Sequence, residues 1–404
     1  MSGTAHATKF LDRIDVASLP GDHEARQSAL AAFFLTGWPD RKHEAWHYTD
    51  LNARMRRFAD EAFVTQAPRP ELPSLGIPRL VFVDGILDKN LSIDALNFLQ
   101  TRGIPEQKTS GSPIVALNAA ITLDGADLKI SAGQNAGTIL LVSVGSTDGL
   151  AIAPRHRITL EKGSNLTVIE VIRGAGRYLH VPVTEINIGD GAALRHFRLQ
   201  EESQDSVHVA TILAAIGESA TYETFTLGIG ASLARSEFHV TLGGRAADVQ
   251  LNAAQLLTGT QHGDVTTIVA HKAPDCTSRQ TVKSVIDGSA RGVFQGRIEV
   301  SHVAQKTDGY QMNQALLLSD SAEIDSKPEL EIFADDVKCS HGATIGALDP
   351  EQIFYLRSRG VSEKEARAIL IRAFLHEALE PITSDVARPI FEAAIQSWRW
   401  GVSG

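Results

Sequence analysis

The chain carries two cysteines, and one of them lies two residues before a histidine. Cys339 and His341 fall in the segment DDVKCSHGATIG, residues 335–346, whereas Cys276 lies far upstream. Thiolate and imidazole are common protein ligands of zinc, iron and copper. Residues two apart on an extended segment direct their side chains to the same face, so Cys339 and His341 can offer two ligands side by side.

Two ligands are half of the set that a closed structural zinc site needs. The pair therefore indicates a site shared with another chain, a transient site, or a purely structural pair. A packed thiol beside a hydrogen-bonded histidine is the commoner role of an isolated Cys-x-His. The strand-like sequence around the pair is rich in acids, which we expect on a solvated sheet face: Glu323, Asp325, Glu329, Glu331, Asp335 and Asp336.

Three further histidines recur in similar surroundings. His180, His208 and His239 lie in LHVPV, VHVAT and FHVTL, and the first two segments are 28 residues apart. A ladder of histidines could line a path for metal. The favoured interpretation is that they stack on a solvated face of a repeat structure.

Several other chemistries are not indicated. The chain has no Gly-x-x-x-x-Gly-Lys-Ser/Thr loop, no Gly-x-Ser-x-Gly elbow and no His-Glu-x-x-His motif. The glycine-rich segment around Gly228 and Gly230 lacks the strand and helix that a dinucleotide site needs.

Composition narrows the class of protein. The 404 residues are 43% hydrophobic and 21% charged, and the formal net charge is −10. This is a globular composition of two or three domains, and an acidic chain without a run of Lys or Arg is a poor candidate for binding nucleic acid or an anionic membrane. No apolar run has the length of a membrane span, and the N-terminus lacks the apolar core of a signal peptide. We therefore predict a cytosolic protein. Two cysteines cannot form a disulfide framework, and in a reducing compartment they are expected to be free thiols or ligands.

Residues 111–346 form the predicted core of the protein. Short β-type segments alternate there with Gly, Asp and Ser, and no long amphipathic helix interrupts them. The related segments EKGSNL, GDGAAL and GESATY begin at 161, 189 and 217, an interval of 28 residues. A fixed interval of this size in strand sequence predicts stacked coils, a β-helix or β-solenoid. A β-sandwich is the alternative, but it does not explain the interval.

The two ends differ from this core. Residues 1–110 contain a helix that Asp22 caps and Gly37 ends, a proline-rich connector at 67–78, and a hairpin around Asp84-Gly85. Residues 347–404 contain three predicted helices. Asp349 is expected to cap the first helix and Ser362 the second. The apolar stripe expected on the second of these helices is Ala366, Ile369, Leu370, Ala373 and Phe374.

The segment 313–360 resembles the SufB/SufD family of iron–sulfur cluster assembly proteins. Its most specific strings are SKPELEIFADDVKCSHGATIG and FYLRSRG, and RKHEAWHYTDL at 41–51 is also similar to the family. The resemblance implies a right-handed parallel β-helix between helical terminal domains. It also implies a complex with a SufB-like scaffold subunit, paired along the late strands, and a SufC-like ABC ATPase, docked on the C-terminal helices.

Two departures bear on the role within that family. SufB-like members carry a cysteine at the position of Gln314 and a glutamate at that of Gly342, so the resemblance places this chain with the SufD-like members and not as the main scaffold. His341, and with it Cys339, is then implied at an interfacial site for transient iron or a nascent cluster, with no tightly bound cofactor. The residues implied at the partner interfaces are Gln314, Glu331, His341, Phe354, Arg357 and Arg359.

The sequence therefore predicts a non-catalytic subunit for cluster assembly. Two alternatives remain at this point: a β-helix enzyme that processes polysaccharide, because this fold hosts many such enzymes, and a purely structural adaptor. A homodimer in the absence of the partner is a further possibility that the sequence does not decide.

Overall fold

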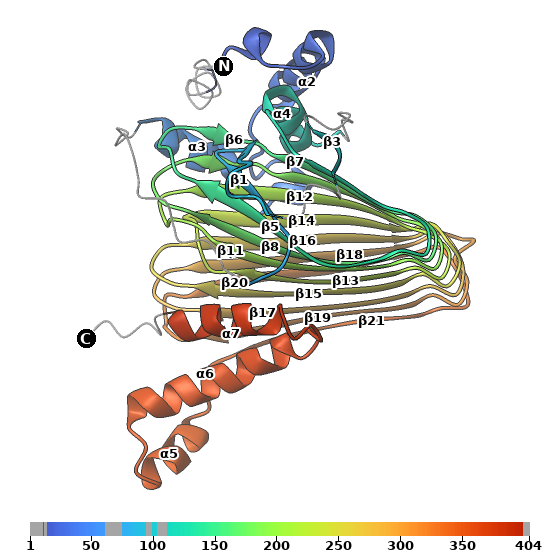
Figure 1. Ribbon diagram of the computed structural model, residues 1–404. Helices are drawn as coiled ribbons and strands as arrows, with labels where there is room; N and C mark the ends of the chain where they lie inside the picture. The colour runs from blue at the N-terminus through green and yellow to red at the C-terminus, as the bar shows by residue number, and fades with distance from the viewer. Residues whose placement is uncertain (1–10, 12–13, 61–74, 94–98, 103–110, 399–404) are drawn as a thin grey trace.

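A computed structural model of the chain describes residues 11, 14–60, 75–93, 99–102 and 111–398. Within these residues, successive strands of the chain alternate between two sheets, and each coil of the chain stacks on the coil before it (Figure 1). Sheet A has the order β2-β1-β5-β8-β11-β13-β15-β17-β19-β21, and sheet B has the order β20-β18-β16-β14-β12-β10-β7-β4-β3, with β9 paired to β12 and β6 paired to β9. The pairs from β4 and β5 onward are parallel, so the predicted β-solenoid is confirmed and the sandwich alternative is wrong.

The strands of sheet A are β2 (Ile86–Leu87), β1 (Arg79–Val83), β5 (Asn135–Gly145), β8 (Asn165–Gly174), β11 (Ala193–Glu201), β13 (Thr221–Gly228), β15 (Asp248–Leu257), β17 (Thr277–Ile286), β19 (Asp308–Leu317) and β21 (Lys338–Gly346). Those of sheet B are β3 (Leu99–Arg102), β4 (Ala126–Ile130), β6 (Ala151–Ile152), β7 (Arg155–Leu160), β9 (Leu179–His180), β10 (Val183–Ile188), β12 (Val207–Ile216), β14 (Leu233–Leu242), β16 (His262–His271), β18 (Arg291–Val300) and β20 (Glu323–Ile332).

The 28-residue interval is the register of sheet A. Asn165 lies beside Ala193, and Ala193 lies beside Thr221 on the next strand. Side chains alternate along each strand, so one set faces the lumen between the sheets and the other faces outward. Leu166, Val168 and their counterparts on the other strands fill the lumen as one large apolar cluster. The repeat places an apolar residue at the same position of successive coils, so these side chains stack on one another.

The N-terminal elements cover the outer face of sheet B. They are η2 (Val16–Ser18), α2 (His23–Thr36), η3 (Glu44–Trp46), α3 (Leu51–Asp60) and α4 (Pro113–Ile121). Asp22 accepts hydrogen bonds from the amides of Glu24 and Ala25, and Gly37 ends α2, as predicted. The predicted hairpin joins β1 and β2 in antiparallel register. Most of the proline-rich connector lies outside the described residues.

The C-terminal helices are α5 (Pro350–Ser358), α6 (Glu363–Leu379) and α7 (Arg388–Ser397), and Asp349 and Ser362 cap the first two as predicted. Helices α6 and α7 pack against the outer face of sheet A. The buried side of α6 differs from the predicted stripe: it consists of Ala366, Ile371, Leu375, Ala378 and Leu379. The sheet meets the later turns of α6 together with α7, and this contact decides which side is buried. No helix in the described ranges is long and apolar enough to cross a membrane.

Candidate functional site at the open end of the solenoid

Cys339 and His341 lie on the last strand of the solenoid. β21 pairs with β19 on one side, and within the described residues no strand covers its other edge. β20 ends sheet B in the same way. The predicted pair therefore stands at the open end of the fold, on an edge that can accept another strand.

Cys339 packs into the solenoid. It lies opposite Gly309 on β19 and contacts the small cluster that contains Ile298, Val300 and Ala304. Burial raises the pKa of the Cys339 thiol, and the amide of Gly309 only partly offsets this. The thiol is therefore predominantly protonated at neutral pH, and metal binding would have to displace its proton.

His341 has different surroundings, although it shares the inner face of the strand. It lies beside Gln311, which lies beside Gln280 on β17, so the three side chains form one row. Gln311 is fully buried, but His341 is exposed, because no further coil formed by the described residues covers it. The imidazole has no hydrogen-bonding partner among the residues that the structure describes, so it differs from the hydrogen-bonded histidine that such pairs commonly contain.

Gln314 and Gly342 lie on the opposite, outer face of the same strands. Gly342 pairs with Met312, and Gln314 is two residues further along β19, next to Lys283 of β17. A Cβ atom at position 342 would stand 2.8 Å from Cε of Met312, so this methionine fills the place of a side chain there. The structure thus separates the predicted residues into an inner pair, Cys339 and His341, and an outer position, Gln314.

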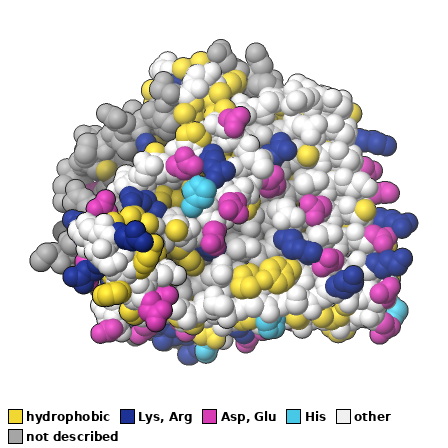
Figure 2. Space-filling view, turned by 90° about the horizontal axis from the view of Figure 1, so that it is seen from below, with side chains coloured by type: hydrophobic (Ala, Val, Ile, Leu, Met, Phe, Trp, Pro, Cys, Tyr) yellow, Lys and Arg dark blue, Asp and Glu magenta, His cyan; other side chains and the backbone are white. Residues whose placement is uncertain are grey.

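The acids of β20 alternate along the strand and face outward. Arg291 binds Asp325 and Arg297 lies 3.7 Å from Glu331, which is half exposed. Asp335 and Asp336 lie in the turn that follows and are exposed. Viewed from below, Lys and Arg side chains lie interspersed with Asp and Glu around apolar patches (Figure 2). The predicted solvated face is confirmed.

Phe354, Arg357 and Arg359 belong to α5 and its C-terminal end, away from Cys339 and His341 in the chain and in the fold. None of the described residues of α5 is buried; the ring of Phe354 is 74% exposed, and that of Tyr355 58%. Arg357 pairs with Glu363 at 3.2 Å. Helix α5 lies below the two sheets, beside the first turns of α6 (Figure 1), so it is a second, separate surface.

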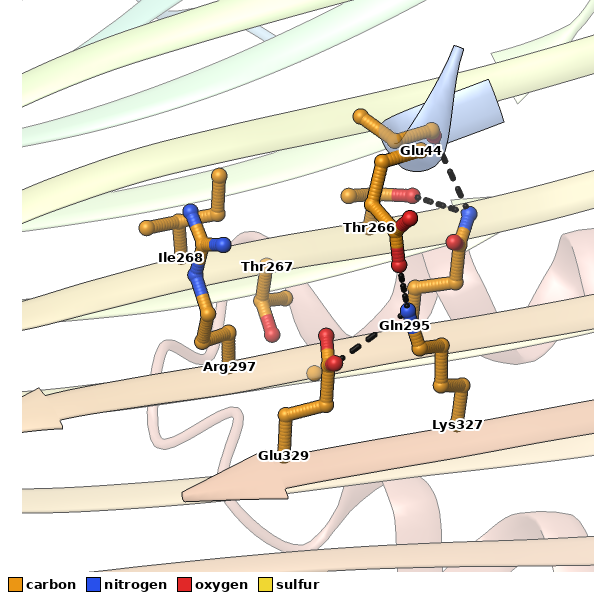
Figure 3. A pocket seen from close by; sticks show the side chains of 10 residues that line it. Glu44, Thr266, Thr267, Ile268, Gln295, Arg297, Lys327 and Glu329 are labelled. Carbon is orange, nitrogen blue, oxygen red and sulfur yellow. Dashed lines mark hydrogen bonds and ion pairs between the residues drawn. The ribbon is translucent and has the colours of Figure 1, made fainter. Parts of the chain in front are cut away.

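The N-terminal segment that contains RKHEAWHYTDL reaches the last coil. Glu44 of η3 binds Lys327 of β20 at 2.6 Å, and Lys327 also lies 3.1 Å from Glu329 (Figure 3). A cavity of about 120 Å³ lies beside these groups. Further lining residues are Ala45, Thr266, Thr267, Ile268, Gln295, Gly296 and Arg297. The ion pairs fasten the N-terminal segment to the outer face of β20, which leaves the edge of that strand uncovered.

The three histidines that recur in the sequence do not occupy equivalent positions in the structure. His180 and His208 are neighbours on β9 and β12, both buried, and both contact Glu202. The expectation of a solvated face is therefore wrong for these two. His239 lies beside Leu213 and pairs with Glu237 at 2.7 Å, so it belongs to a different position of the repeat. Glu202 was not predicted from the sequence, because it lies in a corner that the repeat does not mark.

Comparison with known proteins supports the resemblance. The family model described as SUF system FeS cluster assembly, SufBD core domain, matches residues 143–374. The chain is 34% identical to the iron-sulfur cluster assembly protein SufD of Escherichia coli, with 89% of each chain covered. It is 32% identical to an iron-sulfur cluster assembly SufBD family protein of Synechocystis, over 88% of this chain and 86% of the relative. The chain therefore belongs to the SufBD family of iron–sulfur cluster assembly proteins.

Proposed function

We propose that this chain is a non-catalytic, cytosolic subunit of an iron–sulfur cluster assembly complex. It pairs with a SufB-like scaffold subunit at the open end of the solenoid and anchors a SufC-like ABC ATPase on its C-terminal helices. The observation that carries the proposal is that β20 ends sheet B and β21 ends sheet A, and that no strand in the described part of the chain covers either edge.

The open end has the features of a surface that pairs with another sheet. The two edge strands are ten and nine residues long, and such edges are templates for a further strand unless they are covered. Phe333, directly after β20, is 68% exposed, and Ile345 in β21 is 55% exposed. A partner solenoid that continues both sheets would cover these apolar side chains and satisfy the free backbone groups.

Pairing at this edge would place His341 in a shared site. The exposed imidazole and the Cys339 thiol offer at most two ligands, and a partner strand would add its own. A cluster that must be handed on is released more readily when its ligands are divided between two chains. We therefore assign His341, and secondarily Cys339, to an interfacial site for transient iron or a nascent cluster.

The ATPase surface in this proposal is α5. An unburied helix with Phe354 and Tyr355 exposed is the kind of apolar patch that marks a protein interface. Helix α6 joins this surface to sheet A, because Lys283 of β17 binds Glu377 and donates to the carbonyl of Phe374 at 3.2 Å. Movement of the ATPase could therefore pull on the solenoid and alter the edge.

Proline substitution on β21 tests the pairing. The amide of Lys338 donates to Thr307 next to β19, and amide direction alternates along a strand, so the amide of Ala343 points to the open side. We expect Ala343→Pro to fold as the wild type does and to lose co-purification with the SufB-like subunit. Thr344→Pro is the matched control, because it breaks the ladder to β19 and destabilises the chain by itself. Retention of the partner by folded Ala343→Pro would contradict edge pairing, and a second copy in place of the partner would identify a homodimer.

Replacement of His341 by Ala separates the cluster site from a purely structural adaptor. We expect the complex to remain intact while the iron and sulfide assembled on it decrease. The packing of Cys339 specifically favours the adaptor, because a protonated, half-buried thiol is a poor ligand. Normal cluster assembly on an intact His341→Ala complex would establish the adaptor function.

A further inference from the structure

A second group of metal-ligating side chains lies inside the solenoid, away from the open end. His180 ends β9, His208 is the second residue of β12, and Glu202 follows β11 in the corner between the sheets. Leu179 and Val207, the neighbours of the two histidines, pack against the N-terminal helices. Because side chains alternate along a strand, the histidines face the lumen.

The three side chains form a compact cluster, which we call the buried triad. Nδ1 of His180 lies 2.9 Å from Oε1 of Glu202, and Nδ1 of His208 lies 2.7 Å from Oε2. One ligand atom from each of the three residues lies within 4.8 Å of the other two. Small side-chain rotations would bring all three within the distance of about 2.0–2.2 Å at which zinc binds imidazole and carboxylate.

The polar atoms of the triad are incompletely satisfied. Nδ1 of His208 is buried and, although it lies close to the Glu202 carboxylate, has no hydrogen-bonding partner among the described residues. Buried polar atoms without partners are rare and call for an explanation, such as an ion. Gln200 donates to Oε2 of Glu202 at 3.0 Å, and such a contact orients a carboxylate in the manner of the outer ligands of metal sites.

We propose that His180, Glu202 and His208 bind one divalent first-row transition-metal ion, Zn²⁺ or Fe²⁺, within the solenoid. Two imidazoles and one carboxylate are a ligand set that both ions accept, with a further position left for water. The ion would join two successive coils, since His180 belongs to one coil and Glu202 and His208 to the next. Full burial makes this a resident structural ion and not one that is handed to another protein. The inference rests on the triad and is independent of the proposed function.

Metal titration of the full-length protein tests the site. The test uses a Cys339→Ser/His341→Ala background, so that the open end contributes no ligands. After treatment with chelator, the protein is titrated anaerobically with Zn²⁺ or Fe²⁺ against a chromogenic chelator, and with Co²⁺ for its visible absorption bands. We expect one tightly bound equivalent, a rise in the melting temperature on adding Zn²⁺, and Co²⁺ bands typical of nitrogen and oxygen ligands.

Glu202→Gln keeps the size of the side chain and removes the charge. In the same background it should weaken binding at least 100-fold and abolish the metal-dependent rise in melting temperature. His239→Asn is the matched control and should bind as the background protein does, because His239 lies outside the triad. Absence of a bound equivalent in the background protein overturns the proposal even if Glu202→Gln fails to fold, and so does equal binding by folded Glu202→Gln.

Discussion

His196 and His341 occupy the same row of sheet A but have opposite surroundings. The register runs from His196 to His341 through Thr224, Leu251, Gln280 and Gln311. His196 is fully buried, its Nε2 lies 3.1 Å from Oε2 of Glu170, and burial lowers its pKa. His341 is exposed at the end of the row. The repeat gives both residues an inward direction, and only the presence or absence of a next coil distinguishes them.

This contrast separates two uses of the same fold. In the inner coils, polar side chains in the lumen must find partners within the chain, because water cannot reach them. In the last coil the same positions remain available to another molecule. We therefore expect changes in the inner coils to act on stability, and changes in the last coil to act on association.

Between charged residues of the inner and the last coil, the larger effect on stability is expected from Glu170→Ala in the inner coils. Arg198 donates to Glu170 through Nε at 2.7 Å, and His196 contacts the same carboxylate. Removal of the carboxylate leaves the guanidinium buried without its counter-charge and should cost about 3–5 kcal/mol in the free energy of unfolding. Urea-induced unfolding measures the loss.

Glu331→Ala supplies the comparison from the last coil. Glu331 is half exposed and lies 3.7 Å from Arg297, and surface pairs of this kind contribute about 0–1 kcal/mol. Equal losses for the two variants would mean that the last coil is as closed as the inner ones.

The pH dependence of stability should come from buried histidines of the inner coils. Burial lowers the pKa of His271 to about 4, and its Nε2 lies 2.9 Å from Ser278 Oγ. Between about pH 6.5 and 4 the unfolded chain binds a proton that the folded chain does not, so stability falls as the pH falls. His271 alone should account for about 3 kcal/mol over this range.

Equilibrium unfolding of His271→Gln at several pH values measures this contribution. We expect the dependence of the free energy of unfolding on pH to decrease by the equivalent of about one bound proton. Ser278→Ala is the control: it should lower stability by about 1 kcal/mol and leave the slope in place. An unchanged slope in His271→Gln would show that this histidine is not the titrating group.

The fold could be predicted because the interval between related segments in the sequence equals the offset between paired residues on neighbouring strands. The segments at 161, 189 and 217 share an interval that equals the offset between neighbouring strands, such as Asn165 beside Ala193. Helix caps such as Asp22 and Asp349 act through adjacent amides, so local sequence is sufficient for them. These features depend on contacts that repeat or that lie close together in the chain.

The rest depends on contacts between distant residues. Glu202 reaches His180 and His208 from the connection between β11 and β12, and the related segments of the repeat do not include this connection. His239 has a similar local sequence to His208 but lies at another position in the repeat. The buried side of α6 was mispredicted because the sheet meets its later turns, which the spacing of apolar residues along the helix does not reveal.

The two cysteines provide a milder test of the same contrast. Cys276 is fully buried and contacts the carbonyl of Gly244 at 3.2 Å, whereas Cys339 is only partly buried. We expect iodoacetamide to alkylate Cys339 in the native protein and Cys276 only after unfolding. The rate at Cys339 should increase with pH, because burial raises the pKa of this thiol and the thiolate is the reactive form. Mass spectrometry of the peptides measures both rates, and equal labelling of native Cys276 would contradict the closed inner coils.

The smallest effect on the isolated chain should come from Phe354→Ala on α5. The ring is largely exposed, so its removal should change the free energy of unfolding by no more than about 0.5 kcal/mol. Phe391→Ala is the matched control in α7, where the buried ring packs edge-on against Phe225 at 5.4 Å, and it should cost about 3–5 kcal/mol. If α5 binds the ATPase, Phe354→Ala should nevertheless reduce the amount of ATPase that co-purifies with the chain. A variant that keeps both its stability and its ATPase would show that the partner binds elsewhere, because an exposed aromatic ring at the centre of an interface is expected to contribute to binding.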